Sequence, residues 1–169
     1  MEQNQVNNIG VKNRIIDLLI KNKKLIISFL IIVFVIISSL IFIKIKNEKK
    51  NDLISEKYIE AGIYLSNKEM SKSIKIYDEI IESKNKFYSI LALNILIEKN
   101  LIKDKDKILN YFEIVEDLKL NKNQRDLLLF KKALYLKKYS NSKEGEMLLQ
   151  KLIDSDTKLK EIVEEILSN

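Results

Sequence analysis

The sequence predicts an all-α protein in which a single N-terminal transmembrane helix precedes about seven shorter helices packed as hairpins. Residues 25–43 form an uncharged apolar run long enough to cross a bilayer. From residue 51 onward, apolar residues recur at steps of three and four, without the alternation that is typical of strands. The expected organisation is a cytosolic basic tail at 1–24, a transmembrane helix at 25–43, a linker at 44–50 and a helical domain at 51–169.

The tail before the apolar run begins with polar residues and ends with basic ones. Residues 1–10 are polar and are expected to be disordered. Residues 11–20 place apolar side chains on a broad face, which suits either a short amphipathic helix on the membrane surface or a plain helical lead-in. The tail closes on a basic cluster of Lys21, Lys23 and Lys24.

The run from Leu25 to Ile43 has the length and composition of a membrane span. Sixteen of its nineteen residues are Leu, Ile, Val or Phe, and the other three are Ser. A helix of this length spans ~29 Å, close to the ~30 Å hydrocarbon core of a bilayer. A signal peptide has a shorter apolar run, of about 7–15 residues, followed by a pair of small residues for cleavage, and this sequence lacks that pair. An uncleaved anchor is therefore the prediction.

The positive charge of the chain is concentrated around this span. Residues 1–50 hold nine basic and three acidic residues, whereas residues 51–169 hold 21 of each sign, so the net charge of +6 lies entirely in the first segment. This distribution suits anionic lipid head groups and argues against a nucleic-acid partner. Five Lys or Arg precede the span and five follow it closely, so charge alone does not orient it. The short basic tail favours a cytosolic N-terminus, with the opposite orientation as the alternative.

The residue types needed for most catalytic chemistry are missing. The chain has no Cys and no His, which removes thiolate chemistry, the commonest general base and the commonest transition-metal ligand. Carboxylate pairs are expected to be solvated partners of lysines one helical turn away; they are Asp78-Glu79, Glu116-Asp117 and Glu164-Glu165. We expect no enzyme, no cofactor, no metal site and no small-molecule substrate.

Polar clusters divide residues 51–169 into seven helices of about 12 to 18 residues. The predicted breaks are at 66–68, 83–85, 103–106, 121–123, 140–142 and 154–157. Two hairpins share a pattern of small and bulky residues at offsets 0, 3, 12, 16 and 19, namely Ala61, Tyr64, Ser73, Tyr77 and Ile80, then Ala133, Leu136, Gly145, Leu149 and Leu152. Small residues at 0 and 12 let two helices approach closely. Helix propensity alone favours Ala over Gly at position 145.

This spacing is the tetratricopeptide pattern and predicts a tetratricopeptide-like right-handed stack of helical hairpins. A middle unit begins at Ala92 and Ile95 but has Asp104 at the small position, and a turn three residues longer restores Tyr111 and Ile114.

The arrangement resembles the bacterial ancillary Sec translocon subunit family (YfgM-like). The resemblance rests on the single span, the polar linker, the helical domain closing at residues 158–168, and the stretch 124–133, which is similar to a segment of that family's third repeat. It implies a scaffold in the bacterial inner membrane with a periplasmic domain. The implied partners are translocon subunits, periplasmic chaperones or secreted clients, with lipid contacting residues 25–43. A cytosol-facing structural anchor for a division or assembly factor is the alternative.

The first helix of each hairpin is expected to line a concave, apolar, partner-binding face rimmed by lysine. By helical phase the predicted contact residues are Tyr58, Leu65, Leu93, Leu96, Phe130, Leu134 and Lys137. For each of them, a place in the hydrophobic core is an equally good interpretation.

Overall fold

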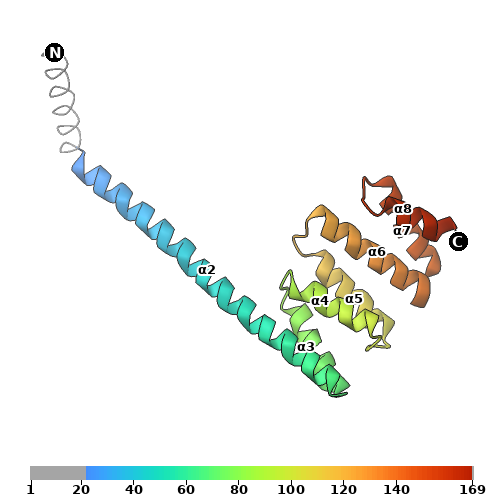
Figure 1. Cartoon of the computed structure of the whole chain (residues 1–169). Helices are drawn as coiled ribbons and strands as arrows, with labels where there is room; N and C mark the ends of the chain where they lie inside the picture. Colours follow the sequence, from blue (N-terminus) through green and yellow to red (C-terminus); the bar gives the residue numbers. More distant parts are fainter. Residues whose placement is uncertain (1–21, 169) are drawn as a thin grey trace, which may run out of the picture. The chain divides into compact units, whose positions relative to one another are not determined.

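The computed structural model describes residues 22–168, apart from the side chains of Ile26 and Leu30. Within these residues it is all-helical, with seven helices: a long apolar helix first, then packed helical hairpins, as the sequence predicts. The chain divides into two units, residues 1–50 and 51–169 (Figure 1). Most of the predicted basic tail, including its proposed amphipathic segment at 11–20, lies outside the described residues.

Helix α2 (Lys23–Ser66) contains the predicted span. An 18-residue window of α2 has a mean hydropathy of 3.2, and none of that window is buried against protein. By length and composition, it is the one helix in the described part of the chain that could cross a membrane. Residues 44–50, predicted as a linker, are helical and continue α2, because this lysine-rich stretch contains no Gly or Pro to end the helix.

The second unit contains residues 51–66 of α2 and six further helices. These are α3 (Met70–Glu82), α4 (Tyr88–Glu98), α5 (Lys105–Glu116), α6 (Lys122–Tyr139), α7 (Ser142–Asp154) and α8 (Lys160–Ser168). Consecutive helices from α3 to α8 pack against one another, and α3 also contacts α5 (Figure 1). The predicted breaks fall at or beside the observed turns, although α4 and α8 are shorter than expected.

Local chemistry explains where these helices begin and end. Asp104, Asn121 and Asn141 each accept hydrogen bonds from backbone N–H groups of the first turn of α5, α6 and α7. At the other end, α2, α3 and α4 are each followed by a residue with positive φ, namely Lys68, Lys84 and Asn100. Helices commonly stop this way, usually at Gly, and here Lys and Asn adopt the left-handed conformation instead.

Two hydrophobic clusters form the interior of the second unit. The larger joins residues of α2 to α6 and includes Tyr77, Leu96 and Phe112. The smaller joins α6, α7 and α8 through Ala133, Leu149, Leu152 and Val163. Helix α6 contributes to both, with Leu128 and Tyr135 in the first and Ala133 in the second. A helix that packs on two sides needs apolar residues around most of its circumference, which α6 has.

The small residues of the two regular hairpins lie where the helices approach closely. Ala61, Ser73 and Ala133 are fully buried. A Cβ atom added to Gly145 would lie 2.6 Å from the carbonyl oxygen of Ala133 and 2.8 Å from the backbone nitrogen of Lys137. Backbone atoms cannot move aside cheaply, so the preference for Ala at position 145 that follows from helix propensity is wrong. In the middle unit Asp104 caps α5 instead of packing between helices.

Candidate protein-binding groove

A groove lies between α4 and α6 on the second unit. It consists of two adjoining hollows of about 140 Å³ and about 280 Å³. The first is lined by residues of the early turns of both helices and the second by residues of their later turns. Asn94 and Lys131 line both hollows, so the two hollows adjoin each other along the groove. Because residue numbers rise in the same direction on both sides, α4 and α6 run parallel along it.

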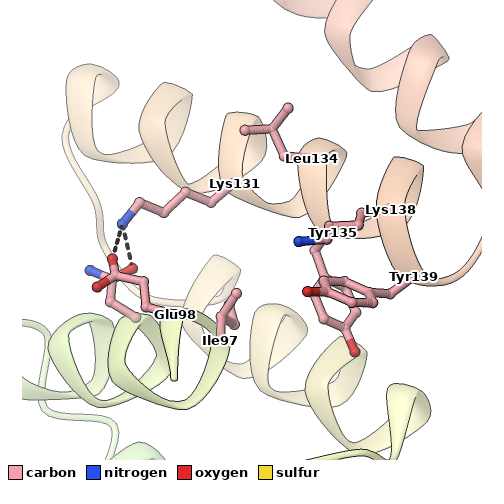
Figure 2. Close-up of a pocket in the computed structure, with 8 residues that line it drawn as sticks. Ile97, Glu98, Lys131, Leu134, Tyr135, Lys138 and Tyr139 are labelled. Carbon is pink, nitrogen blue, oxygen red and sulfur yellow. Dashed lines mark hydrogen bonds and ion pairs between the residues drawn. The ribbon is translucent and has the colours of Figure 1, made fainter. Parts of the chain in front are cut away.

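A polar bridge crosses the middle of this groove. The Lys131 ammonium donates a hydrogen bond to Asn94 Oδ1 at 2.8 Å and lies 3.6 Å from Glu98 Oε1. Figure 2 shows the Lys131 side chain reaching from α6 across to Glu98 on α4. Glu98 is the one carboxylate among the residues that line the two hollows. The bridge separates the hollows without filling either of them.

Apolar and aromatic side chains line the two ends. The smaller hollow is walled by Phe87, Ile90, Leu91, Leu127 and Leu128. The larger is walled by Ile97, Leu134, Tyr135 and Tyr139, with Lys138 beside them (Figure 2). The rings of Tyr135 and Tyr139 lie 5.2 Å apart, and the Lys138 ammonium lies 4.9 Å from the Tyr139 ring centre. Burial is the main cause that raises the pKa of the Tyr135 hydroxyl above its ordinary value.

Of the predicted contact residues on α4 and α6, Leu134 lines the groove. Leu93 and Leu96 are 1% and 0% exposed and belong to the larger cluster, so they are core side chains and offer no surface to a partner. Phe130 packs, half-buried, against the smaller cluster. Lys137 donates a hydrogen bond to the carbonyl oxygen of Ile166 at 3.2 Å and so ties α6 to α8.

The two predicted residues on α2 lie elsewhere. Tyr58 is half-buried, with its ring 5.8 Å from that of Tyr77 and 5.7 Å from that of Tyr88. Leu65 packs, partly buried, against the larger cluster. Neither residue lines the two hollows. Burial, and secondarily the charge of Glu98, raises the pKa of Tyr58.

Several groove residues that were not predicted directly follow a predicted residue along the chain. Asn94 and Ile97 follow Leu93 and Leu96, while Lys131 and Lys138 follow Phe130 and Lys137. One residue is a rotation of about 100° around a helix, so a small error in phase moves a side chain from the core to the surface. The polar residues Asn94 and Glu98 were the signal available, because they mark the exposed side of α4.

Cross-helix ion pairs link α2 to α3, α3 to α5 and α5 to α6. Lys57 of α2 pairs with Glu79 at 2.7 Å, Lys107 with Asp78 at 3.1 Å, and Lys132 with Glu116 at 3.0 Å. The expectation of partners one turn away is therefore wrong for these three carboxylates, which reach lysines 22, 29 and 16 residues distant. Glu164 does pair with Lys160, four residues before it. The hydrogen bond from Lys57 lowers the pKa of Glu79.

Tyr111 joins one of these pairs from the interior. Its hydroxyl donates to Asp78 Oδ1 at 2.5 Å, and its ring centre is 5.6 Å from the Lys107 ammonium. Burial, followed by the hydrogen bond to Asp78, raises the pKa of Tyr111 from 10.0 to about 12. The hydrogen bonds with Tyr111 and Asp78 raise the pKa of Lys107. The Tyr111 hydroxyl and the Lys107 ammonium, both on α5, thus bind the same carboxylate of α3.

We expect this raised pKa to make the second unit lose stability in alkali. An unfolded tyrosine ionises near pH ~10, whereas folded Tyr111 stays neutral to about pH 12. The stabilisation is therefore complete below pH ~10 and is lost as the pH rises through about 12. Denaturant unfolding of Tyr111→Phe at a series of pH values should show a shallower alkaline decline than the unchanged chain. A tyrosinate absorbance difference between the two proteins that appears near pH 10 would contradict this assignment.

Within residues 22–168, no group of three or more Asp, Glu, His or Cys side chains is placed to hold a metal ion. Comparison with protein-family models, curated proteins and solved structures found no match to this chain. The features of this chain that bear on function are the groove, the apolar helix and the charge distribution.

Proposed function

We propose that this chain is a membrane-anchored scaffold that binds a segment of another protein in the groove between α4 and α6. The observation that carries the proposal is the pair of adjoining hollows, apolar at their ends and crossed by one polar bridge. Sites that bind a peptide combine apolar pockets with a few placed polar groups in this way. The exposed apolar side chains at the rim, Phe87 and Leu127, add to the area that a partner could cover.

The exposed apolar part of α2 supports the anchor. Large apolar side chains of this part, among them Leu25, Phe34 and Phe42, are exposed in the structure, and lipid would cover them. Removal as a signal peptide would require a cleavage site after Ile43, and the sequence there is Lys-Ile-Lys-Asn-Glu-Lys-Lys. An anchored domain searches a thin layer beside the membrane, so a weak groove can be occupied through high effective concentration.

The partners to test first come from the resemblance to ancillary Sec translocon subunits. Translocon subunits, periplasmic chaperones and secreted clients all present segments near the outer face of the inner membrane, where this proposal places residues 51–169. The opposite orientation would make the chain a cytosolic anchor for a division or assembly factor. A reporter fused after Asn169 that is active only outside the cytosol separates the two.

A photo-crosslinking residue at Lys138, which is exposed and lines the larger hollow, tests the groove. Leu127→Glu should reduce the crosslinks to membrane-proximal proteins about tenfold, because it puts a carboxylate into the apolar hollow that the partner would fill. Leu127 is 44% exposed, so the change should leave the fold intact. Met147→Glu is the matched control, since Met147 is 58% exposed on α7 and lines neither hollow.

Two outcomes would overturn the groove as the binding site. The first is equal crosslinking in Leu127→Glu and in the unchanged chain. The second is crosslinking that survives Leu127→Glu and disappears when residues 25–43 are replaced by an unrelated apolar span. In that case the partner is recognised inside the membrane.

A further inference from the structure

The two walls of the groove repeat the same pattern. On α4, apolar Ile90 is followed four residues later by Asn94 and seven residues later by Ile97. On α6, Leu127 is followed at the same offsets by Lys131 and Leu134. Each wall therefore has an apolar, a polar and an apolar residue at offsets 0, 4 and 7. The two polar residues, Asn94 and Lys131, are hydrogen-bonded to each other.

This repeat sets the spacing of the two apolar sites. Seven residues of helix cover ~10.5 Å, so the apolar sites lie about that far apart along the groove. A helix lying parallel to α4 and α6 would present side chains with the same seven-residue spacing on one face. An extended strand presents one face at multiples of about 6.6 Å, which places its side chains out of step with the second site. The groove geometry favours a helical occupant.

Charge around the groove favours an acidic occupant. The charged residues lining the two hollows are Lys131, Lys138 and Glu98, a balance of +1. The Lys131 ammonium is shared between Asn94 and Glu98. Lys138 is exposed and lies over the Tyr139 ring, with no carboxylate within ion-pair distance among residues 22–168. Its charge remains available to a bound partner.

We infer that the groove takes an amphipathic helix with apolar side chains at positions i and i+7 and a carboxylate between them. The apolar side chains enter the hollows beside Leu127 and Leu134, while the carboxylate meets Lys131 and Lys138 at the bridge. This inference rests on the proposed function, because it names the class of segment that the groove would hold. The 7-residue repeat on both walls and the local excess of positive charge carry it.

The test uses the full chain in detergent and designed, fluorescently labelled peptides. The helical probe is Ala-rich, with Leu at i and i+7 and Glu at i+3 and i+4, so that either direction of binding places a carboxylate at the bridge. A second probe has Lys in place of both Glu residues. A third, Pro-rich probe carries the same Leu and Glu residues in an extended chain. Fluorescence anisotropy should show the acidic helix binding about threefold to tenfold more tightly than the basic one, as a partly exposed ion pair would give.

Charge variants locate this preference. Lys138→Glu changes the balance of the groove from +1 to −1, and the preference for the acidic helix should disappear or reverse. Lys143→Glu is the matched control, because Lys143 is exposed on α7 and lines neither hollow, yet the net charge of the protein changes equally. A preference that survives Lys138→Glu, or that falls as much in Lys143→Glu, overturns the acidic part of the inference.

The remaining outcomes separate this inference from the proposed function. If the extended probe binds as tightly as the acidic helix and both are lost in Leu127→Glu, the groove binds segments that need not be helical. The proposed function then stands and the inference fails. If no probe binds, the inference also fails, while crosslinking at Lys138 still decides the proposed function. If binding of every probe is unaffected by Leu127→Glu and crosslinking is too, both fail.

Discussion

Leu96→Ala should lower the free energy of unfolding of the second unit by about 2–5 kcal/mol, the usual range for removing a buried Leu side chain. Leu96 is 0% exposed and lies in the larger cluster with Tyr77 and Phe112. The truncation leaves a cavity among these side chains. Denaturant unfolding can be followed by tyrosine fluorescence, because all seven tyrosines lie in residues 51–169 and the chain has no Trp.

Ile97→Ala is the matched control for this change. Ile97 is the next residue on the same helix, but it is half-buried and lines the groove, so its truncation should cost less than half as much. Equal losses for the two variants, or a larger loss for Ile97→Ala, would show that the face of α4 is assigned incorrectly. A charged residue at position 96 would unfold the unit, so its effect on binding could not be interpreted. Leu96 is therefore not the surface contact that the sequence predicts.

Gly145→Ala should destabilise the second unit, although Ala is the better helix former. The added Cβ would meet backbone atoms of Ala133 and Lys137 at less than 3 Å, so α7 must move away from α6. Overpacking of this kind typically costs about 1–3 kcal/mol, and the gain in helix propensity returns at most about 1 kcal/mol. The same tyrosine fluorescence measurement applies, because Tyr135 and Tyr139 lie on α6.

Gly62→Ala is the same chemical change, but we expect it to raise the free energy of unfolding. Gly62 lies inside α2, and a Cβ added there would have no neighbour within 4 Å. Only the helix propensity changes, so the free energy of unfolding should rise by about 0.5–1 kcal/mol. If both substitutions stabilise the protein, the close approach of α6 and α7 at Gly145 is incorrect. If both destabilise it, the space beside Gly62 is occupied in the folded protein.

Features that depend on one stretch of chain could be predicted from the sequence. The apolar run 25–43 defines its own helix, because its length, its lack of charge and its lack of Gly and Pro are local properties. The breaks between helices follow from local caps such as Asn121 and Asn141, whose side chains bond to the next turn. The small residues Ala61, Ser73 and Ala133 predicted the close approach of helices, and they are fully buried.

The direction in which the apolar faces point could not be predicted. Helix α4 has apolar residues on nearly all sides, and one of its few polar residues, Ser89, is buried because its hydroxyl donates to the carbonyl oxygens of Ile80 and Ile81. Helix α6 carries four consecutive apolar residues, 127–130, which cover its whole circumference. Without a polar edge the helical phase is ambiguous. An error of one residue therefore assigned core side chains, such as Leu96, to the binding face in place of groove residues such as Ile97.

The sequence by itself determined the apolar helix and the approximate positions of the breaks between the helices that follow, since each depends on neighbours a few positions away. The seven helices predicted for residues 51–169 are the end of α2 and six separate helices. Only the tertiary structure decided that Leu96 is core while Ile97 lines the groove, that Lys107 reaches Asp78, and that Gly145 has no room for a Cβ. These depend on which helices meet and at what depth, because the deciding atoms belong to residues 8 to 37 positions apart along the chain. The hydrogen bond from Lys131 to Asn94, at the middle of the groove, joins residues 37 positions apart, the widest separation among these contacts.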